Sequence, residues 1–396
     1  MTTTSVEPVA YPFDDGESLV LHESYRAART APGMFRVRLP FGEPAWLATR
    51  YADVRIVLGD SRFSRAAALE NDEPRLRPHS AHIGLMSMDP PDHTRLRTLV
   101  AKAFTVRRVE SLRPRIREIA SSLVTDLVAA GPPADLVDAF ALPLPVAVIC
   151  ELLGVPVEDR PRFRVWSDNA LSTCRLTPQE LMASRQQLAE YLAGLIAQRR
   201  ADPADDLMTA LIEARDEQDR LTEQEMISLC GNILIAGHET TASQIPNFVL
   251  TLLDHPGQLA LLRERPDLLP GAVEELLRYV PLIAGSSFAR YAKEDVQLGD
   301  VVVRAGEPVI AAISAANRDE LRYDDPDALR VDREVNQHLA LGHGVHHCLG
   351  AALARVELQE ALRALLAGPP DLHLAGEIIW KTQMFVRGPA AMPIAW

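Results

Sequence analysis

The chain has 396 residues, of which 47% are hydrophobic, so it is long and apolar enough to bury a large core. Its formal net charge of −13 argues against non-specific nucleic-acid binding, which depends on clustered Lys and Arg. The four cysteines lie far apart, which favours a reducing compartment over a disulfide framework. The sequence shows no signal peptide and no run of about 18 apolar residues, so we expect a cytoplasmic protein that does not span a membrane.

Strands and helices are expected to alternate in an uneven way along the chain. Residues 34–48 alternate and turn like a hairpin. Long helices are predicted next, at 107–130, 177–200, 221–254 and 271–279, separated by breaks that carry Pro and Gly. Short strands return at 296–303 and 309–313, with glycines at the turns. We therefore expect one mainly α domain over residues 1–396, with a β-rich part at about 30–60 and 285–315 plus C-terminal strands.

The helix predicted at 221–254 contains an apolar run that is broken by Gly237, Glu239 and Thr240. Gly237 lowers helix stability by about 1 kcal/mol relative to Ala. Pro246 removes the hydrogen bond to the carbonyl of Ala242, which predicts a kink. Charged and hydroxyl groups in an apolar helix are costly unless they are used. A polar patch that faces solvent is the simpler alternative.

Charged side chains at helical spacing form two further pairs. His93 and Arg97 are four residues apart on a helix predicted to begin after Pro91, so they share a face and can grip a carboxylate or phosphate. Glu275 and Arg278 are three apart, which is ion-pair spacing. Taken singly, each pair is also what an ordinary solvated helix face shows.

The segment 341–350 carries the most chemistry in the chain. It reads Leu-Gly-His-Gly-Val-His-His-Cys-Leu-Gly and lies directly before a helix-forming run at 351–366. Its glycines allow φ > 0 and a close approach to a flat partner. Cys348 precedes a helix N-terminus, which favours a thiolate that can bind metal. Inert packing of the cysteine is one alternative, and a zinc site with His343, His346 and His347 is another, although no second pair of cysteines lies nearby.

Taken together and in this order, the motifs resemble those of a bacterial cytochrome P450 over essentially the full chain. The matched segments are the His93/Arg97 helix, Ala236-Gly237-His238-Glu239-Thr240, Glu275-x-x-Arg278, Ala316-Asn317-Arg318-Asp319 and the Gly-x-Gly-x-His-x-Cys-x-Gly loop. The loop is the most specific of these. The chain ends and residues 152–156 are most similar to actinobacterial members that modify macrolides and other polyketides.

The resemblance implies the P450 fold, with haem b between the long central helix and the helix after the cysteine loop. Cys348 would be the axial ligand of the haem iron. Side chains expected to hold the propionates are His93, Arg97, Arg290 and His346. Other residues expected at the cofactor are Ala236, Gly237, Leu341, Gly342 and Gly350, of which Leu341 departs from the usual Phe.

Two further pairs acquire roles through the same resemblance. Glu275 and Arg278 match a buried structural pair of the family. Glu239 and Thr240 match the acid–alcohol pair of the oxygen-binding groove, in which the alcohol hydrogen-bonds to the bound oxygen and the acid relays protons.

The implied activity is monooxygenation, in which O2 and two electrons hydroxylate or epoxidise a bulky hydrophobic substrate such as a macrolide or another polyketide of antibiotic biosynthesis. Residues expected to line the substrate are Leu282, Ala284, Ser286, Met384 and Phe385. Electrons would come from a ferredoxin and its reductase, for which a basic cluster is a candidate docking surface: Lys102, Arg107, Arg108, Arg113, Arg115 and Arg117. A peroxide-driven haem-thiolate hydroxylase and a non-catalytic haem sensor are the alternatives; the acid–alcohol pair disfavours the first, and the lack of a signalling module disfavours the second.

Overall fold

The computed structural model describes residues 7–78, 84–172, 176–204, 206–216, 220–283, 288–334 and 336–396. Helices dominate these residues, as predicted. The α-helices are α1 Glu23–Thr30, α2 Tyr51–Gly59, α3 Asp92–Ala101, α4 Val106–Ala130, α5 Pro143–Leu153, α6 Arg160–Leu171, α7 Pro178–Ala201, α8 Leu207–Asp216, α9 Glu223–Leu253, α10 Pro256–Glu264, α11 Leu269–Tyr279, α12 Ile313–Ala316 and α13 Ala351–Ala367.

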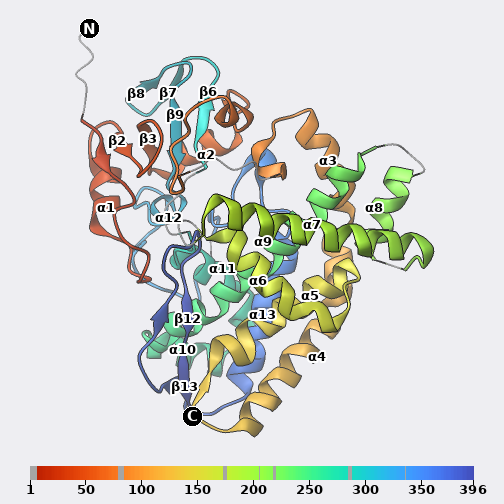
Figure 1. Cartoon of the computed structure of the whole chain (residues 1–396). Coiled ribbons are helices and arrows are strands. Elements are labelled where there is room, and N and C mark those ends of the chain that lie inside the picture. Colours follow the sequence, from red (N-terminus) through yellow and green to blue (C-terminus); the bar gives the residue numbers. More distant parts are fainter. Residues whose placement is uncertain are drawn as a thin grey trace.

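The largest sheet has the strand order β1-β2-β3-β9-β6-β4. Its strands are β1 Val9–Ala10, β2 Phe35–Arg38, β3 Ala45–Ala48, β4 Phe63–Ser64, β6 Arg290–Ala292 and β9 Pro308–Ala311. β2 and β3 pair antiparallel, which confirms the predicted hairpin, and β3 pairs parallel with β9 through Leu47 and Ile310. The two β-rich parts of the sequence therefore form one sheet, which lies beside α1 in Figure 1.

Smaller sheets complete the β portion. β7 Val296–Leu298 and β8 Val301–Val303 form a hairpin that turns at Gly299, where φ is 51°. Near the C-terminus, β11 Ile379–Trp380 pairs with β12 Pro389–Ala391, and β13 Pro393–Ala395 lies between β10 His373–Leu374 and β5 Ala134–Asp135. These strands confirm the C-terminal β segment expected from the sequence.

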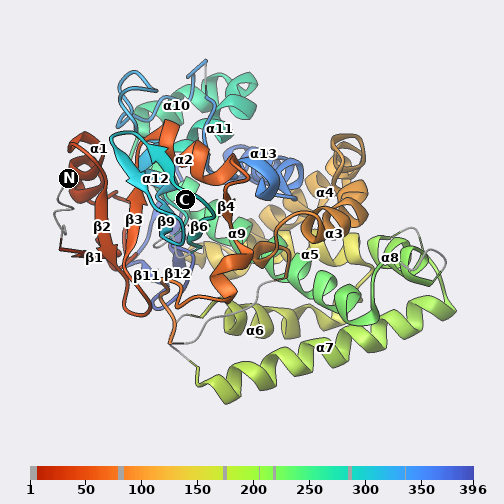
Figure 2. The ribbon, with the colours of Figure 1, turned by 90° about the horizontal axis from the view of Figure 1, so that it is seen from above.

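Local capping explains why two long helices begin close to their predicted starts. The side chain of Thr177 accepts a hydrogen bond from the backbone of Glu180, whose carboxylate bonds back to Thr177, and Thr222 and Glu225 repeat this arrangement at α9. α7 runs along one edge of the molecule beside α6 (Figure 2). α9 continues through Pro246 to Leu253, so the proline does not end the helix. Burial of the flanking Ile245, Asn247 and Phe248 favours the helix despite the lost hydrogen bond.

α9 is the central helix of the main hydrophobic core, where it packs against α5, α7 and α13. At Gly237 a Cβ atom would lie 2.7 Å from Cδ1 of Ile149 on α5. The glycine therefore lets α9 and α5 pack closely, because a larger residue would push the side chain of Ile149 aside.

Candidate active site

The cysteine loop packs against the end of α2 and leads directly into α13. Gly342 and Gly344 have φ values of 77° and 70°, as predicted for this loop. A Cβ at Gly344 would lie 2.6 Å from both the Leu58 carbonyl oxygen and the Cα of Gly59. The close approach that Gly344 permits is thus to the end of α2, not to a flat partner. At Gly350, by contrast, no atom of the described residues lies within 4 Å of where a Cβ would stand.

Cys348 is held at the end of this loop, just before α13. Its backbone N–H donates to the carbonyl of Leu341 at 2.8 Å. Burial raises the pKa of the Cys348 thiol, and a backbone hydrogen bond from Gly350 and the charges of Arg97 and Arg355 oppose this only in part. The expectation of an easily ionised thiol is therefore wrong for the protein alone; a bound metal cation would favour the thiolate.

A zinc site at the loop is not supported. Within the described ranges, no group of three or more His, Cys, Asp or Glu side chains is arranged to hold a metal ion. Cys150 and Cys230 are buried within α5 and α9 and do not belong to the loop. Cys174 lies outside the described residues. His343 packs against Gly59 at the end of α2 instead of joining a ligand set.

Buried cationic and imidazole groups converge near the loop from three segments. The rings of His93 on α3 and His346 lie 4.4 Å apart. Burial, together with the positive charge of Arg290, lowers the pKa of His346 to about 3. Burial and the neighbouring charge of Arg65 lower the pKa of Arg290 to about 10. Both ring nitrogens of His93 and Nε2 of His346 are buried without a hydrogen-bond partner among the described residues. Such a cluster is costly unless anionic oxygens satisfy it.

Arg97 shares the α3 face of His93 but contacts the loop backbone. Its Nη2 donates to the carbonyl of His347 at 2.6 Å. Its positive charge also acts on Cys348. Arg97 therefore stabilises the cysteine loop by a hydrogen bond from α3 to the loop backbone.

One stripe of α9 is left uncovered although most of this helix is buried. Ala236 is exposed, and Asn232 and Thr240, four residues to either side, are half-buried. The spacing places the three residues on one face of the helix. The Thr240 hydroxyl donates to the carbonyl of Ala236 at 2.9 Å. The middle of the longest helix thus borders open space where the resemblance expects cofactor and oxygen.

Glu239 points away from that stripe and is buried. Its carboxylate forms an ion pair with Lys381, which follows β11. His238 is also buried, and its Nδ1 lies 3.0 Å from the carbonyl of Leu234. Lys381 is not predicted as a site residue from the sequence; the only signal for it is that lysine occurs at three positions in the whole chain. Arg65 was missed as well, and no local pattern marks it.

Glu275 and Arg278 form a fully buried ion pair on α11, with Nε of Arg278 at 2.7 Å from Oε2 of Glu275. Arg333 and Asn336 donate to the same carboxylate at 3.0 and 2.9 Å. Arg278 also donates to the carbonyl of Asn317, within the Ala-Asn-Arg-Asp motif, at 2.8 Å. These contacts tie α11 to two distant segments.

Three of the expected substrate residues lie on adjoining segments, and two are not described. Ala284 and Ser286 lie outside the described residues. Met384 bridges to Ser172, just past α6, and the backbone N–H of Phe385 donates to the carbonyl of Leu171 at 3.1 Å. The carbonyl of Leu282 accepts from the backbone of Arg387 at 2.7 Å. Residues 171–172 therefore lie beside 384–385, and residue 282 lies beside 387 of the same C-terminal segment.

The predicted basic cluster is largely neutralised. Arg113 and Arg117 both pair with Glu360 on α13, and Arg115 pairs with Glu151 on α5. Within α4 itself, Arg113 also pairs with Glu110, and Arg115 also pairs with Glu118. Lys102 and Arg107 are exposed. Three of the six cations of the cluster, Arg113, Arg115 and Arg117, are therefore paired with acidic side chains of distant helices.

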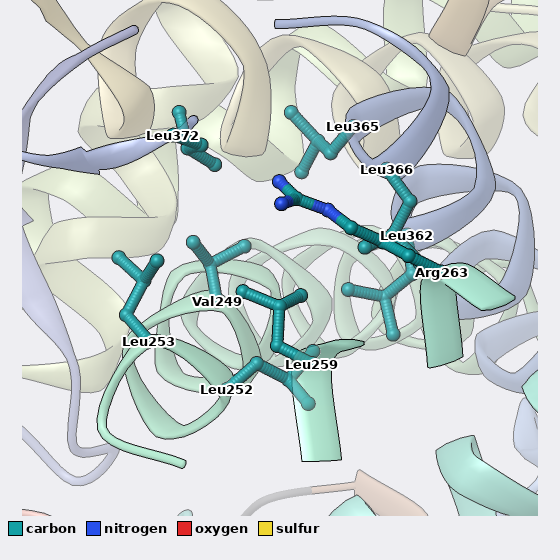
Figure 3. Close-up of a pocket in the computed structure, with 9 residues that line it drawn as sticks. All are labelled: Val249, Leu252, Leu253, Leu259, Arg263, Leu362, Leu365, Leu366 and Leu372. Carbon is teal, nitrogen blue, oxygen red and sulfur yellow. The ribbon is translucent and has the colours of Figure 1, made fainter. Parts of the chain in front are cut away.

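A small apolar cavity of about 20 Å³ lies between α9, α10 and α13. Figure 3 shows the leucines that line it and the side chain of Arg263, which extends between them. This volume is enough for about one water molecule. None of the predicted site residues lines it, so it is not the active site.

The residues around the cysteine loop and the uncovered stripe of α9 fit a haem. The partnerless nitrogens of His93 and His346 and the buried Arg290 suit two carboxylates. The open stripe on α9 and the empty space beside Gly350 leave room for a flat group on the side of Cys348.

No helix in the described part of the chain is long and apolar enough to cross a membrane.

Comparisons with known proteins agree with this fit. Residues 168–367 match the family model described as Cytochrome P450. Mycinamicin IV hydroxylase/epoxidase of Micromonospora griseorubida is 53% identical over 396 residues, covering 99% of this chain and all of the relative. Nocardicin C N-oxygenase of Nocardia uniformis subsp. tsuyamanensis is 50% identical over 99% of this chain and all of the relative.

Solved structures give the same result. HinD superposes with a TM-score of 0.94 at 50% identity, covering 98% of this chain and 99% of HinD. The mixed-function P450 MycG superposes with a TM-score of 0.92 at 53% identity, covering 98% of this chain and 100% of MycG. The chain therefore belongs to the cytochrome P450 family and is a haem-dependent monooxygenase.

Proposed function

We propose that the chain hydroxylates or epoxidises a macrolide or another bulky polyketide during the biosynthesis of a secondary metabolite. The observation that carries this proposal is the 53% identity, from end to end, to a mycinamicin IV hydroxylase/epoxidase. A variant of MycG, equally similar, has been solved in complex with mycinamicin IV. The alignment of relatives along nearly the whole chain supports treating residues 1–396 as one domain, and the wide spacing of the four cysteines in the sequence supports a cytoplasmic location.

Cys348 would ligate the haem iron. His93 and His346 would bind the propionates with their buried ring nitrogens, and the buried guanidinium of Arg290 would do the same. Arg97 would hold the loop by its bond to the His347 carbonyl. The haem supplies oxygen activation: with two electrons and two protons, one atom of O2 enters the substrate and the other leaves as water.

The protein's own contribution to that step is proton delivery. Thr240 borders the open stripe of α9, where its hydroxyl can turn from the Ala236 carbonyl to water or oxygen. Glu239, which directly precedes Thr240, is the adjoining ionisable group on this helix and would supply protons to Thr240 by way of water. Their adjacent positions on α9 support the roles implied by the acid–alcohol motif.

Electrons would come from a ferredoxin and its reductase, because the sequence contains no flavin or dinucleotide motif. The docking surface we propose is reduced to the exposed Lys102 and Arg107, with Val106 between them at 68% exposure. An exposed apolar side chain between cations suits an acidic partner. Replacing both cations with alanine should raise the KM for ferredoxin, most strongly at low ionic strength, whereas Arg265→Ala, at another exposed arginine, should not.

A turnover assay tests the activity. The haem-loaded protein is incubated with a panel of macrolides and polyketides, either with a surrogate ferredoxin system or with peroxide alone. Oxidised macrolide in the ferredoxin arm supports the proposal. Product in the peroxide arm alone would identify a peroxide-driven hydroxylase, and ligand-dependent spectral shifts without product in either arm would favour a haem sensor.

Substitution of Thr240 tests the acid–alcohol roles separately. Thr240→Ala should lower the product formed per electron consumed and raise peroxide release, while haem content is unchanged. Thr240→Ser keeps the hydroxyl and should couple nearly as well as wild type. Equal coupling in Thr240→Ala and wild type would refute the role.

A further inference from the structure

Glu239 has a buried partner that is remote in sequence. The Glu239 carboxylate is 1% exposed and forms an ion pair with Nζ of Lys381. Nζ also donates to the hydroxyl of Ser243 at 3.0 Å, and that hydroxyl lies 3.5 Å from Oε1 of Glu239. Because Ser243 is one turn after Glu239, both residues face Lys381 from the same side of α9. The three side chains form a closed polar cluster.

Lys381 supplies the positive charge of this cluster. Among the described residues, His238 also lies beside the carboxylate, with its Nε2 4.0 Å from Oε2 of Glu239. Burial lowers the pKa of His238, with Glu239 and Asp168 acting in the opposite direction, so the imidazole is neutral near pH 7. A carboxylate buried this deeply needs a paired cation to stay ionised. That cation is the ammonium group of Lys381.

The backbone around Lys381 is clamped to α9. The N–H of Lys381 donates to the carbonyl of Gly388 across the base of the β11–β12 hairpin, at 2.9 Å. The side chain of Asn247 on α9 donates to the carbonyl of Arg387 at 3.1 Å. A Cβ on Gly388 would lie 3.2 Å from the Cβ of Ser243, so the hairpin and the helix are in contact. These contacts hold the backbone of Lys381 beside α9, and the bonds to Glu239 and Ser243 then place Nζ.

Lys381 is also the member of the cluster that reaches solvent. Its side chain is 11% exposed, against 1% for Glu239. Farther along the same hairpin, Phe385 bonds to the backbone at Leu171, in the region expected to line the substrate. One hairpin thus connects solvent, the buried acid and the substrate side.

We propose that Lys381 is a positioning residue for proton delivery, which holds Glu239 ionised and fixed where the cluster meets solvent. The carboxylate takes a proton from bulk water, becomes a neutral acid, and is restored to the paired carboxylate when that proton leaves through water towards Thr240. This inference rests on the roles proposed above for Glu239 and Thr240.

Substitution of Lys381 tests the inference in the haem-loaded enzyme. Lys381→Met should lower product formed per electron consumed by about tenfold, a part of the roughly 10²–10⁴-fold that a positioned acid–base group contributes. It should raise the solvent isotope effect on kcat and leave the substrate KM unchanged. Lys381→Arg should restore most of the coupling, and Lys293→Met, at an exposed lysine, should behave as wild type.

Amine labelling tests the ion pair without reference to activity. Since Lys102, Lys293 and Lys381 are the only lysines, acetic anhydride labelling read by peptide mass spectrometry reports each one, and the two exposed lysines serve as internal standards. Lys381 should react more slowly than both standards in wild type and faster in Glu239→Gln. Labelling of Lys381 at the rate of the standards in wild type would overturn the inference. This comparison decides the matter even if Lys381→Met does not fold.

The two proposals fail in different ways. If Thr240→Ala uncouples the reaction and Lys381→Met does not, the positioning role is wrong and the acid–alcohol roles stand. If neither variant uncouples, the acid–alcohol roles fail, and the role of Lys381 fails with them.

Discussion

Replacing the buried carboxylate of Glu275 tests how much its hydrogen bonds contribute to the stability of the fold. Its oxygens accept hydrogen bonds from Arg278 at 2.7 and 2.8 Å, from Arg333 and Asn336, and from the backbone N–H of Arg330 at 3.0 Å. Glu275→Gln keeps the shape but removes the charge and one acceptor. The buried guanidinium of Arg278 is then left without a counter-charge, which costs about 3–5 kcal/mol.

That cost converts into a measurable change in Tm. At roughly 2.1 cal/mol/K per residue, the 396 residues give an unfolding entropy of about 0.8 kcal/mol/K, so Tm should fall by about 4–6 °C. Thermal unfolding of the haem-loaded protein, followed by far-UV circular dichroism, measures this change. Asp267→Asn is the control, because it breaks the pair with Arg265 in which both side chains are more than half exposed, and it should leave Tm nearly unchanged. Equal shifts in the two variants would refute the reasoning.

Other expected outcomes concern the cofactor and acid pH. Cys348→Ser should abolish the red-shifted Soret band of the reduced CO complex; retention of that band would exclude thiolate ligation by Cys348. Arg290→Leu should weaken haem binding by about tenfold in titrations of the apoprotein, the loss of about one charge-assisted hydrogen bond, and unchanged affinity would contradict a propionate contact. Burial alone would raise the pKa of Glu274, but hydrogen bonds from His338 and Arg355 lower it to about 2. Stability from this group is therefore present above pH 4.5 and lost as pH falls towards 2, so the destabilisation caused by Arg355→Met in urea titrations should shrink over that window. A pH-independent difference would show that the pair does not act through ionisation.

Local signals in the sequence predicted much of the fold. Capping residues such as Thr177 and Thr222 are read directly from the chain, and the glycines of the cysteine loop adopt the positive φ values expected of them. The order of the motifs identified the family, which the comparisons confirm.

What sequence reasoning missed depends on contacts between distant segments. The helix N-terminus suggested an ionised Cys348, but the burial that outweighs it comes from the whole fold. Arg117 looked like part of a basic patch because its partner, Glu360, is 243 residues away. Lys381 is 142 residues from Glu239, and no spacing rule connects a hairpin to a helix at that range.

The contact between Gly59 and Gly344 has a practical consequence for engineering. A Cβ at Gly59 would lie 2.9 Å from the ring of His343, just as one at Gly344 would collide with α2. Because backbone meets backbone here, the contact sets how the sheet-bearing part of the chain is aligned with the cysteine loop. Libraries that vary the segments around 171–172 and 384–385 to change substrate preference can therefore keep positions 59 and 344 as glycine, so that selection acts on the pocket while the loop that carries Cys348 stays in place.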